Sequence, residues 1–268
     1  MYLSNGYVTI DDPMVRDLWR SKDGREWEMV LANTPYDGHS AIAVHNNRIF
    51  AAKNTVWMSS DGEYWELISG YGPTTDPDAL ARMISFKGYL WFFYLDQVSS
   101  SVDGTTWTAT SAPFGRRGGY AVVADENYIY VLGGSTLTPN LPPETAYPER
   151  TSLNDVWRSS DGVNWVRLVK HAPWSPRIWP GAVVHRGSIY LFGGFDNIAG
   201  DNIGELWKSD DGANWQRVVT ALEPPKRHWP SLFSFKNSLY MVAGNGWPVR
   251  NDVWRLESSN PILRALPF

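Results

Sequence analysis

The chain has 268 residues, no cysteine and a formal charge of −4. The absence of thiols excludes disulfides and thiolate metal sites. An acidic balance without any run of Lys or Arg argues against a general binder of nucleic-acid phosphates. No apolar stretch approaches the roughly 20 residues that cross a bilayer. No signal-peptide layout is present, so the sequence predicts no membrane insertion and assigns no compartment.

A seven-residue pattern, Ser-x-Asp-Gly-x-x-Trp, occurs five times. Its copies begin at Ser21, Ser59, Ser101, Ser159 and Ser209, and a degraded sixth copy follows Trp254. The copies start 38 to 58 residues apart, which indicates an array of like units. Each unit reads as four short strands rich in Val, Ile, Tyr and Trp, separated by Gly, Asn and Asp turns.

The strands follow in chain order. The first unit is abridged, with Tyr2–Ser4 and Tyr7–Ile10 as strands around a hairpin turn at Asn5-Gly6, and a further strand at Asp17-Leu18-Trp19. Four later units have two-residue turns of types that tolerate positive φ: Asn46-Asn47, Lys87-Gly88, Arg186-Gly187 and Lys236-Asn237. Ile262–Leu266 is the expected fourth strand of the last unit, and side-chain packing is expected to join the first and last units.

Several second strands end in a glycine pair, as in Leu132-Gly133-Gly134 and Phe192-Gly193-Gly194, and a partial pair follows Val242. With the aromatic residues on the outer strands, this pattern resembles a divergent kelch repeat. The Ser-x-Asp-Gly-x-x-Trp turn also resembles the Asp-box of sialidase-like propellers, with one residue fewer between Asp and Gly. Both families form β-propellers.

We therefore expect one all-β domain, a six-bladed β-propeller of four-stranded antiparallel blades with an abridged first blade. The expected blades span approximately residues 1–31, 37–69, 79–110, 117–170, 178–220 and 228–268.

The repeated residues read as structural. Ser and Asp in a tight turn accept hydrogen bonds from nearby backbone N–H groups, Gly supplies the permissive φ, and the Trp packs between sheets. A calcium site is disfavoured because each turn offers one carboxylate, whereas calcium takes six or more oxygens. We therefore predict no metal and no cofactor. In kelch relatives binding occurs on the opposite face, here called the top face, which carries the loops that join strands two and three and successive blades.

Three departures from the repeat coincide on the top face of blades four to six. Alignment puts Arg116, Arg177 and Arg227 at equivalent positions, and Trp179 and Trp229 follow two of them. The top loops of these blades are also long, with a proline-rich insert in blade four, Phe195 in the loop of blade five and Trp247 in that of blade six. Third, the remaining inter-blade loops are rich in aromatic residues, among them Trp174. Indole faces can stack on sugars and guanidinium forks can bind a carboxylate, so this cluster suggests a glycan or a partner with an acidic group. The alternative is that the arginines pair with neighbouring blades and the tryptophans pack against them.

Catalytic groups are scarce. His45 and His185 share one position near a turn and read as core residues, which leaves His39 and His228 as acid/base histidines. If the chain resembles a six-bladed sialic-acid mutarotase, Glu223 and Asp196 are further candidates for the acid/base pair. A sialidase would use the three arginines. The absence of Cys removes a copper-radical oxidase of the galactose oxidase type.

The sequence thus predicts a non-catalytic module that binds a glycan or a protein partner through the top face of blades four to six. The alternatives are a mutarotase-like or sialidase-like enzyme, and a structural protein–protein scaffold of a virion or cell surface. The candidate ligand-binding residues are Arg116, Arg177, Trp179, Arg227, Trp229, His228, Trp174, Trp247 and Phe195.

Overall fold

The computed structural model describes residues 1–6, 15–76, 79–137, 147, 149–257 and 262–266. Every regular element in these ranges is a β-strand, and the strands pair in antiparallel sheets. The expected all-β class is therefore confirmed. No helix in the described ranges is long and apolar enough to cross a membrane.

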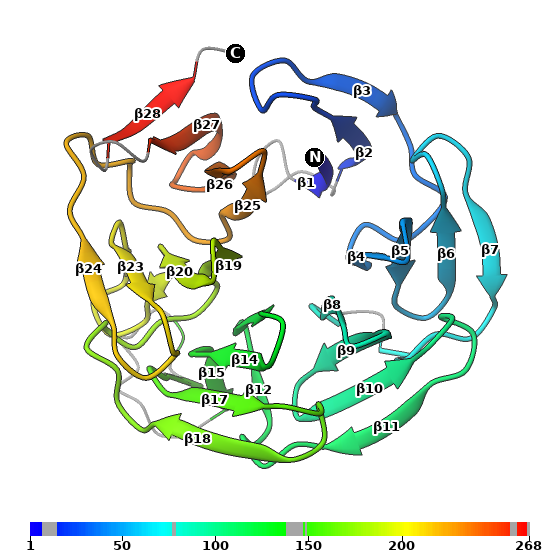
Figure 1. Ribbon diagram of the computed structural model, residues 1–268, viewed down its shortest axis with the longest axis horizontal. Helices are drawn as coiled ribbons and strands as arrows, with labels where there is room; N and C mark the ends of the chain where they lie inside the picture. The colour runs from blue at the N-terminus through cyan, green and yellow to red at the C-terminus, as the bar shows by residue number, and fades with distance from the viewer. Residues whose placement is uncertain (7–14, 77–78, 138–146, 148, 258–261, 267–268) are drawn as a thin grey trace.

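Six sheets, numbered here in chain order, make up the body of the described structure (Figure 1). Sheet 1 contains β1 (Tyr2–Gly6), β2 (Val15–Arg20) and β3 (Glu28–Leu31). Sheet 2 contains β4 (Ala41–His45), β5 (Arg48–Ala52), β6 (Val56–Ser59) and β7 (Glu66–Ser69). Sheet 3 contains β8 (Arg82–Phe86), β9 (Tyr89–Tyr94), β10 (Gln97–Ser101) and β11 (Thr108–Ser111).

The second half of the chain forms three more four-stranded sheets. Sheet 4 contains β13 (Ala121–Ala124), β14 (Ile129–Leu132), β17 (Val156–Ser159) and β18 (Trp165–Val169). Sheet 5 contains β19 (Gly181–His185), β20 (Ser188–Phe192), β23 (Leu206–Ser209) and β24 (Gln216–Val218). Sheet 6 contains β25 (Ser231–Phe235), β26 (Ser238–Asn245), β27 (Val249–Glu257) and β28 (Ile262–Leu266), so the strand expected at the end of the chain is present.

The sheets follow one another around a common centre, with β4, β8, β19 and β25 nearest to it and β7, β11, β18, β24 and β28 towards the rim (Figure 1). The inner strands of neighbouring sheets contact each other, β4 with β8, β8 with β13, β13 with β19 and β19 with β25. The apolar core lies between consecutive sheets. It continues from sheet 6 to sheet 1, where Tyr240 and Val242 pack near Leu3 and Trp27.

The hairpins between first and second strands have the predicted turns. Asn46 and Asn47 have φ of 47° and 59°, and the pairs at 87–88, 186–187 and 236–237 likewise have positive φ at both residues. Two positive φ values match the right-handed twist of the strands that the turn joins. These turns explain why Asn, Gly, Lys and Arg replace the β-branched residues of the adjoining strands at these points.

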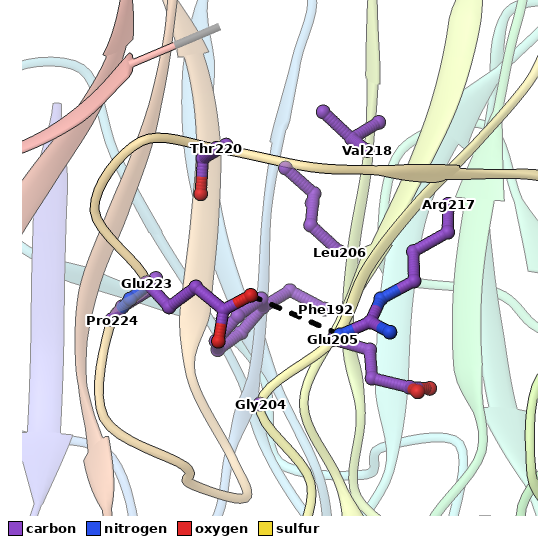
Figure 2. A pocket seen from close by; sticks show the side chains of 9 residues that line it. All are labelled: Phe192, Gly204, Glu205, Leu206, Arg217, Val218, Thr220, Glu223 and Pro224. Carbon is purple, nitrogen blue, oxygen red and sulfur yellow. Dashed lines mark ion pairs between the residues drawn. The ribbon is translucent and has the colours of Figure 1, made fainter.

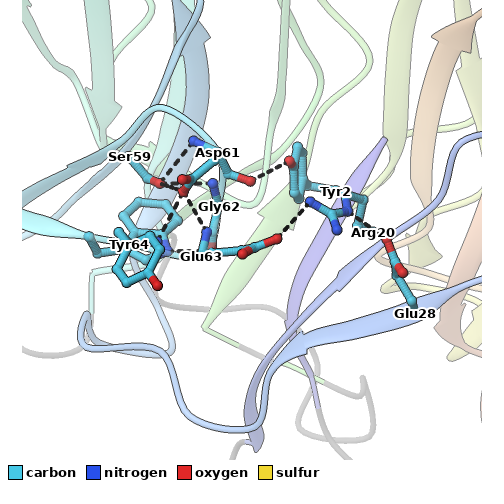
Figure 3. Close-up of polar contacts among 9 residues, drawn as sticks. Tyr2, Arg20, Glu28, Ser59, Asp61, Gly62, Glu63 and Tyr64 are labelled. Atoms are coloured by element: carbon cyan, nitrogen blue, oxygen red, sulfur yellow. Dashed lines mark hydrogen bonds and ion pairs between the residues drawn. The ribbon is translucent and has the colours of Figure 1, made fainter.

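The Ser-x-Asp-Gly turn is held by its own side chains (Figure 3). Ser59 Oγ accepts a hydrogen bond from Gly62 N at 2.8 Å, and Asp61 Oδ1 accepts hydrogen bonds from the backbone N of Glu63 and Tyr64. Trp65 Nε1 then donates to Gly62 O at 2.9 Å, and the later copies repeat this bond through Trp107, Trp165 and Trp215. The repeated residues therefore have the structural role that was expected of them.

The glycine of each turn also lies against an aromatic ring of the preceding sheet. A Cβ placed on Gly62 would come within 2.7 Å of the Tyr2 ring, so only glycine fits there. The same contact recurs around the structure, with Gly24 on Tyr240, Gly104 on Phe50, Gly162 on Trp91 and Gly212 on Tyr130. Sheet 6 is thus joined to sheet 1 by the same contact that joins sheets 1 to 5 to one another.

One expectation for sheet 1 is wrong. Asn5 and Gly6 lie within β1, which pairs directly with β2, and do not form a hairpin turn. The ring of Tyr2 takes the place held in other sheets by second-strand aromatics such as Phe50. Strand β1 therefore corresponds to the second strand of the other sheets, although it is the strand of the described sheet 1 that lies nearest the centre (Figure 1). The strand expected at Tyr7–Ile10 lies outside the described residues.

Sheets 4, 5 and 6 each carry an extension on the side of the long loops. In sheet 4 it is a separate small sheet of β12 (Arg117–Gly118), β15 (Ser135–Leu137) and β16 (Arg150–Ser152). In sheet 5, β21 (Phe195–Asp196) pairs with β22 (Asp201–Asn202), and Ile178 bridges to Phe195. In sheet 6, β26 and β27 continue past the sheet and His228 bridges to Asn245. These extensions position the candidate site.

Candidate functional site

Arg177 and Arg227 are completely buried, which corrects the expectation that they contact a ligand. Arg177 donates to the carbonyl oxygens of Ser175 and Gly193 and to Glu205 Oε2 at 3.1 Å. Arg227 is held in the same way by two carbonyl oxygens and by Asp252. Each guanidinium has its donors used inside the protein, so no fork remains for a carboxylate.

The third member of this set is Arg117, not Arg116. Arg117 is 4% exposed, donates to Phe114 O and Gly133 O, and forms two hydrogen bonds with Asp155 at 2.6 and 3.0 Å. Arg116 is exposed. The expected alignment was wrong by one residue because two arginines are adjacent. Since the three aligned arginines are paired inside the protein, they give no reason to expect an acidic group on the ligand.

Each carboxylate in these clusters also accepts a hydrogen bond from a tryptophan two residues later. Asp155 accepts from Trp157 Nε1 at 2.7 Å, and the same bonds join Trp207 to Glu205 and Trp254 to Asp252. Burial opposes ionisation of Glu205, but the hydrogen bonds from Trp207 and Arg177 outweigh it and lower the pKa of Glu205. Burial lowers the pKa of Arg177 to about 10, so it stays charged at neutral pH. Each cluster holds the start of the third strand against the loop that precedes the first strand of the same sheet.

The aromatic residues of the connecting loops have the same structural character. Trp174 is 1% exposed and packs edge-on against Trp215, with ring centroids 6.0 Å apart. Phe114 packs in the same way on Trp165. Trp174 is therefore a core residue, and its assignment to a ligand site was wrong.

A different set of rings does gather beside the extensions of sheets 5 and 6. Trp179 lies 4.8 Å from Trp229 and 5.3 Å from His228, and Trp247 lies 5.1 Å from His228 and 5.4 Å from Phe195, measured between ring centroids. We call the contiguous set formed by Tyr147, Trp179, Phe195, His228, Trp229 and Trp247 the aromatic surface.

Five of its six members were predicted as site residues, and the structure brings them together. Tyr147 was missed. It lies 5.5 Å from Trp179, and its backbone is tied to Asn197 by hydrogen bonds in both directions. The only signal for it in the sequence was an aromatic residue inside a proline-rich insert.

Phe195 and His228 form the buried base of the aromatic surface, at 2% and 3% exposure. Trp247 is 46% exposed, and Trp179 and Trp229 are partly exposed. The surface thus has a rigid base and accessible indoles, which suits a contact surface for an apolar face.

The indoles of Trp179 and Trp229 are positioned by an unusual backbone. Their φ values are 57° and 53°, in the left-handed region that bulky residues rarely adopt. Trp179 N donates to Gly119 O at 2.6 Å, and Trp229 N donates to Trp179 O at 2.8 Å. A Cβ on Gly119 would come within 2.9 Å of the Trp179 indole, so glycine leaves room for that ring. Backbone strain of this kind tends to occur at functional sites.

His228 is fixed within the surface by a polar chain. Its Nδ1 lies 2.6 Å from Asn202 Oδ1, and Asn202 Nδ2 donates to Asn245 O at 3.1 Å. Because the Asn202 amide must present its oxygen to the ring, Nδ1 carries the proton and Nε2 is an acceptor. Burial lowers the pKa of His228 to about 4, which keeps the ring neutral at physiological pH.

The groups considered for catalysis lie on different elements. His39 precedes β4, with Nδ1 3.8 Å from Asp37 Oδ1, while Asp196 lies in β21 and its Oδ1 accepts from two backbone N–H groups of its own turn. Asp196 also borders a hollow of about 200 Å³ together with Thr151, Ser152, Pro176 and Ile198. Within the described ranges, no three His, Cys, Asp or Glu side chains are grouped to hold a metal ion.

Glu223 borders a second hollow, formed by the segment after β24 and the strands β20 and β23 (Figure 2). Glu223 points across this hollow to Arg217, with 3.9 Å between Oε1 and Nη2. The hollow has a volume of about 10 Å³, close to the lower limit for one water molecule. It is too small to take a sugar.

No protein-family model matches this chain, and no curated protein matches it.

Proposed function

We propose that the chain is a six-bladed β-propeller of divergent kelch type, with sheets 1 to 6 as its blades. One three-stranded and five four-stranded antiparallel sheets, which follow one another around a common centre, support this fold (Figure 1). The recurring contact between a turn glycine and the ring of the preceding sheet supports closure, because it also joins Gly24 to Tyr240. Closure of the ring lets the first and last blades bury apolar side chains against each other, and radial repetition leaves only short sheet edges.

We further propose that this propeller is a non-catalytic module that binds a carbohydrate on the aromatic surface. One observation about the indole N–H groups carries this proposal. Ten of the fifteen tryptophans donate Nε1 to a protein oxygen. Two others, Trp27 and Trp174, have Nε1 buried without a partner.

Three tryptophans remain, Trp179, Trp229 and Trp247, and all three belong to the aromatic surface. Their Nε1 atoms have no hydrogen-bond partner among the described residues and are not among the buried unpaired atoms. An unpaired but accessible N–H beside an aromatic face is suited to a ligand with both C–H faces and oxygens, which is the chemistry of a sugar ring.

The other functions have less support. An enzyme of the mutarotase or sialidase type would need its acid/base groups or arginines at one site, whereas His39, Asp196 and Glu223 have separate local contacts and the arginines are internal. A protein partner would use the same aromatic surface, and the experiment below separates it from a sugar.

The test is a glycan array probed with the wild-type chain and two variants. Trp247→Ala should lose binding to the glycans that the wild type retains. Tyr71→Ala is the matched control, because Tyr71 is 87% exposed and lies outside the aromatic surface, and it should bind as the wild type does. Silence on every glycan, or equal binding by Trp247→Ala, would contradict the proposal. Loss of a protein partner on Trp247→Ala with a silent array would instead favour a protein ligand.

A further inference from the structure

His228 contributes the one imidazole among the six rings of the aromatic surface. The other five rings are three indoles, one phenol and one phenyl ring. The His228 ring lies 5.1 to 5.5 Å from the three indoles with accessible N–H groups, between ring centroids. It is 3% exposed, so its position is set by packing and by Asn202.

The hydrogen-bond chain leaves one ring nitrogen unused. Nδ1 donates to Asn202 Oδ1, whose amide orientation is fixed by the bond from Nδ2 to Asn245 O. Nε2 is then a lone-pair acceptor. No described residue donates a hydrogen bond to it. Nε2 is not among the buried side-chain nitrogens that lack a partner, as Trp174 Nε1 is, so it retains contact with solvent.

An unprotonated Nε2 restricts what can lie against it. A hydroxyl or an N–H can donate to this nitrogen, whereas a carboxylate, a phosphate or a carbonyl oxygen offers only lone pairs and is repelled. The indoles around it have the opposite polarity, since each indole N–H is a donor only. A sugar hydroxyl can satisfy both, because it donates to Nε2 and accepts from an indole N–H.

We propose that His228 Nε2 accepts a hydrogen bond from one hydroxyl group of the bound sugar and thereby selects the sugar by the position of that hydroxyl. This inference rests on the proposed carbohydrate function of the aromatic surface. The indoles supply the contact area, and His228 supplies the discrimination, because a sugar without a donor at that position leaves a buried acceptor unpaired.

Two substitutions separate the ring nitrogens. In His228→Asn the side-chain amide can still donate to Asn202 Oδ1, but no atom reaches the position of Nε2. In His228→Gln the longer side chain can place its amide oxygen near that position and retains an acceptor. The melting temperatures of both variants are measured first, so that lost binding is compared among folded proteins.

The binding experiment uses methyl glycosides of glucose, galactose, mannose and N-acetylglucosamine, followed by the monodeoxy analogues of the sugar that binds. We expect His228→Asn to weaken binding about five- to tenfold, as for loss of one buried hydrogen bond. We expect His228→Gln to recover much of it. One deoxy analogue should bind the wild type more weakly than the parent sugar by the same factor. His228→Asn should bind that analogue and the parent sugar with equal affinity.

The outcomes distinguish the inference from the proposed function. If Trp247→Ala abolishes sugar binding while His228→Asn binds as the wild type does, the surface binds sugars but His228 does not select them. The inference would also be overturned if every deoxy analogue lost the same binding affinity. It would be overturned too if the loss of affinity from the deoxy analogue added to the loss from His228→Asn. If none of the methyl glycosides binds and the array is silent, both proposals fail together.

Discussion

Gly24 of the first turn lies against the ring of Tyr240 in sheet 6, where an added Cβ would be 2.5 Å from Tyr240 Cε1. The Tyr240 hydroxyl also donates to Asp23 O at 3.1 Å, as Tyr2 donates to Asp61 O between sheets 1 and 2. Two residues more than 200 positions apart therefore make the contact that neighbouring sheets make elsewhere. Among the described residues, β1 pairs with β2 and β28 pairs with β27, and the first and last sheets meet through side chains.

The first prediction concerns this junction. Gly24→Ala should destabilise the protein through two effects, the left-handed φ of 83°, at about 1–2 kcal/mol, and overlap with the Tyr240 ring, at about 1–3 kcal/mol. Gly88→Ala is the matched control, because its φ is 81° but nothing lies within 4 Å of the added carbon. Urea unfolding measures both variants. Equal losses would show that the contact with Tyr240 contributes nothing.

The second prediction uses the adjacent pair Arg116 and Arg117. Arg117→Ala should cost about 3–5 kcal/mol, because it leaves the buried Asp155 carboxylate without its partner. Arg116→Ala should lie within about 0.5 kcal/mol of the wild type, because Arg116 is exposed. Chemical denaturation of the two variants decides between them. A larger loss of stability for Arg116→Ala would mean that Arg116, and not Arg117, pairs with Asp155.

The structural features that repeat along the chain could be predicted from the sequence. The hairpin turns at Asn46-Asn47 and Arg186-Gly187 and the Ser-x-Asp-Gly turns could be predicted because each depends on local backbone geometry. The hairpin at Asn5-Gly6 failed because strand pairing with β2 overrode a local turn preference.

The arginines show the other limit. Their burial depends on carboxylates 25 to 38 residues away in the sequence, and pairing at that distance is not visible in a local pattern. The acid two residues before the strand-three tryptophan in sheets 4, 5 and 6 was the available signal, as in Asp155 and Trp157. The aromatic surface was predicted better, because Trp179, Trp229 and Trp247 stand out from the repeat, but that they contact one another follows only from the extensions of sheets 5 and 6.

The third prediction tests how the surface is positioned. Gly119→Ala should displace the Trp179 indole, which lies 2.9 Å from the added carbon, and weaken sugar binding about tenfold, equivalent to about 1.4 kcal/mol. Gly118→Ala is the neighbouring control, because its added carbon meets only Arg150 Nη1 at 3.9 Å. Tryptophan fluorescence reports the displacement and titration with the bound glycoside reports the affinity. Unchanged fluorescence and affinity in Gly119→Ala would show that Trp179 does not depend on the space at Gly119.

The fourth prediction follows from the burial of His228, which lowers its pKa from 6.5 to about 4. Between these values the unfolded chain binds a proton that the folded protein does not, so the free energy of unfolding rises with pH across this window. The contribution of His228 is complete above pH 6.5 and is lost as the pH falls towards 4, by about 3 kcal/mol at most. The charged residues next in sequence to His228 and to its partner Asn202 are Arg227, which is paired with Asp252, and Asp201, which is paired with Lys226.

Urea unfolding at several pH values between 4 and 6.5 measures this dependence. His228→Asn removes the titrating group and should flatten the pH dependence, whereas His171→Asn is the control, since His171 is exposed. Burial also lowers the pKa of His185, so a residual slope of the same sign should persist in His228→Asn. Asp211, with its pKa lowered to about 2 chiefly by its hydrogen bond from the Asn214 backbone, acts only below this window. An unchanged slope in His228→Asn would mean that the buried imidazole does not resist protonation, and it would also weaken the case for Nε2 as an acceptor.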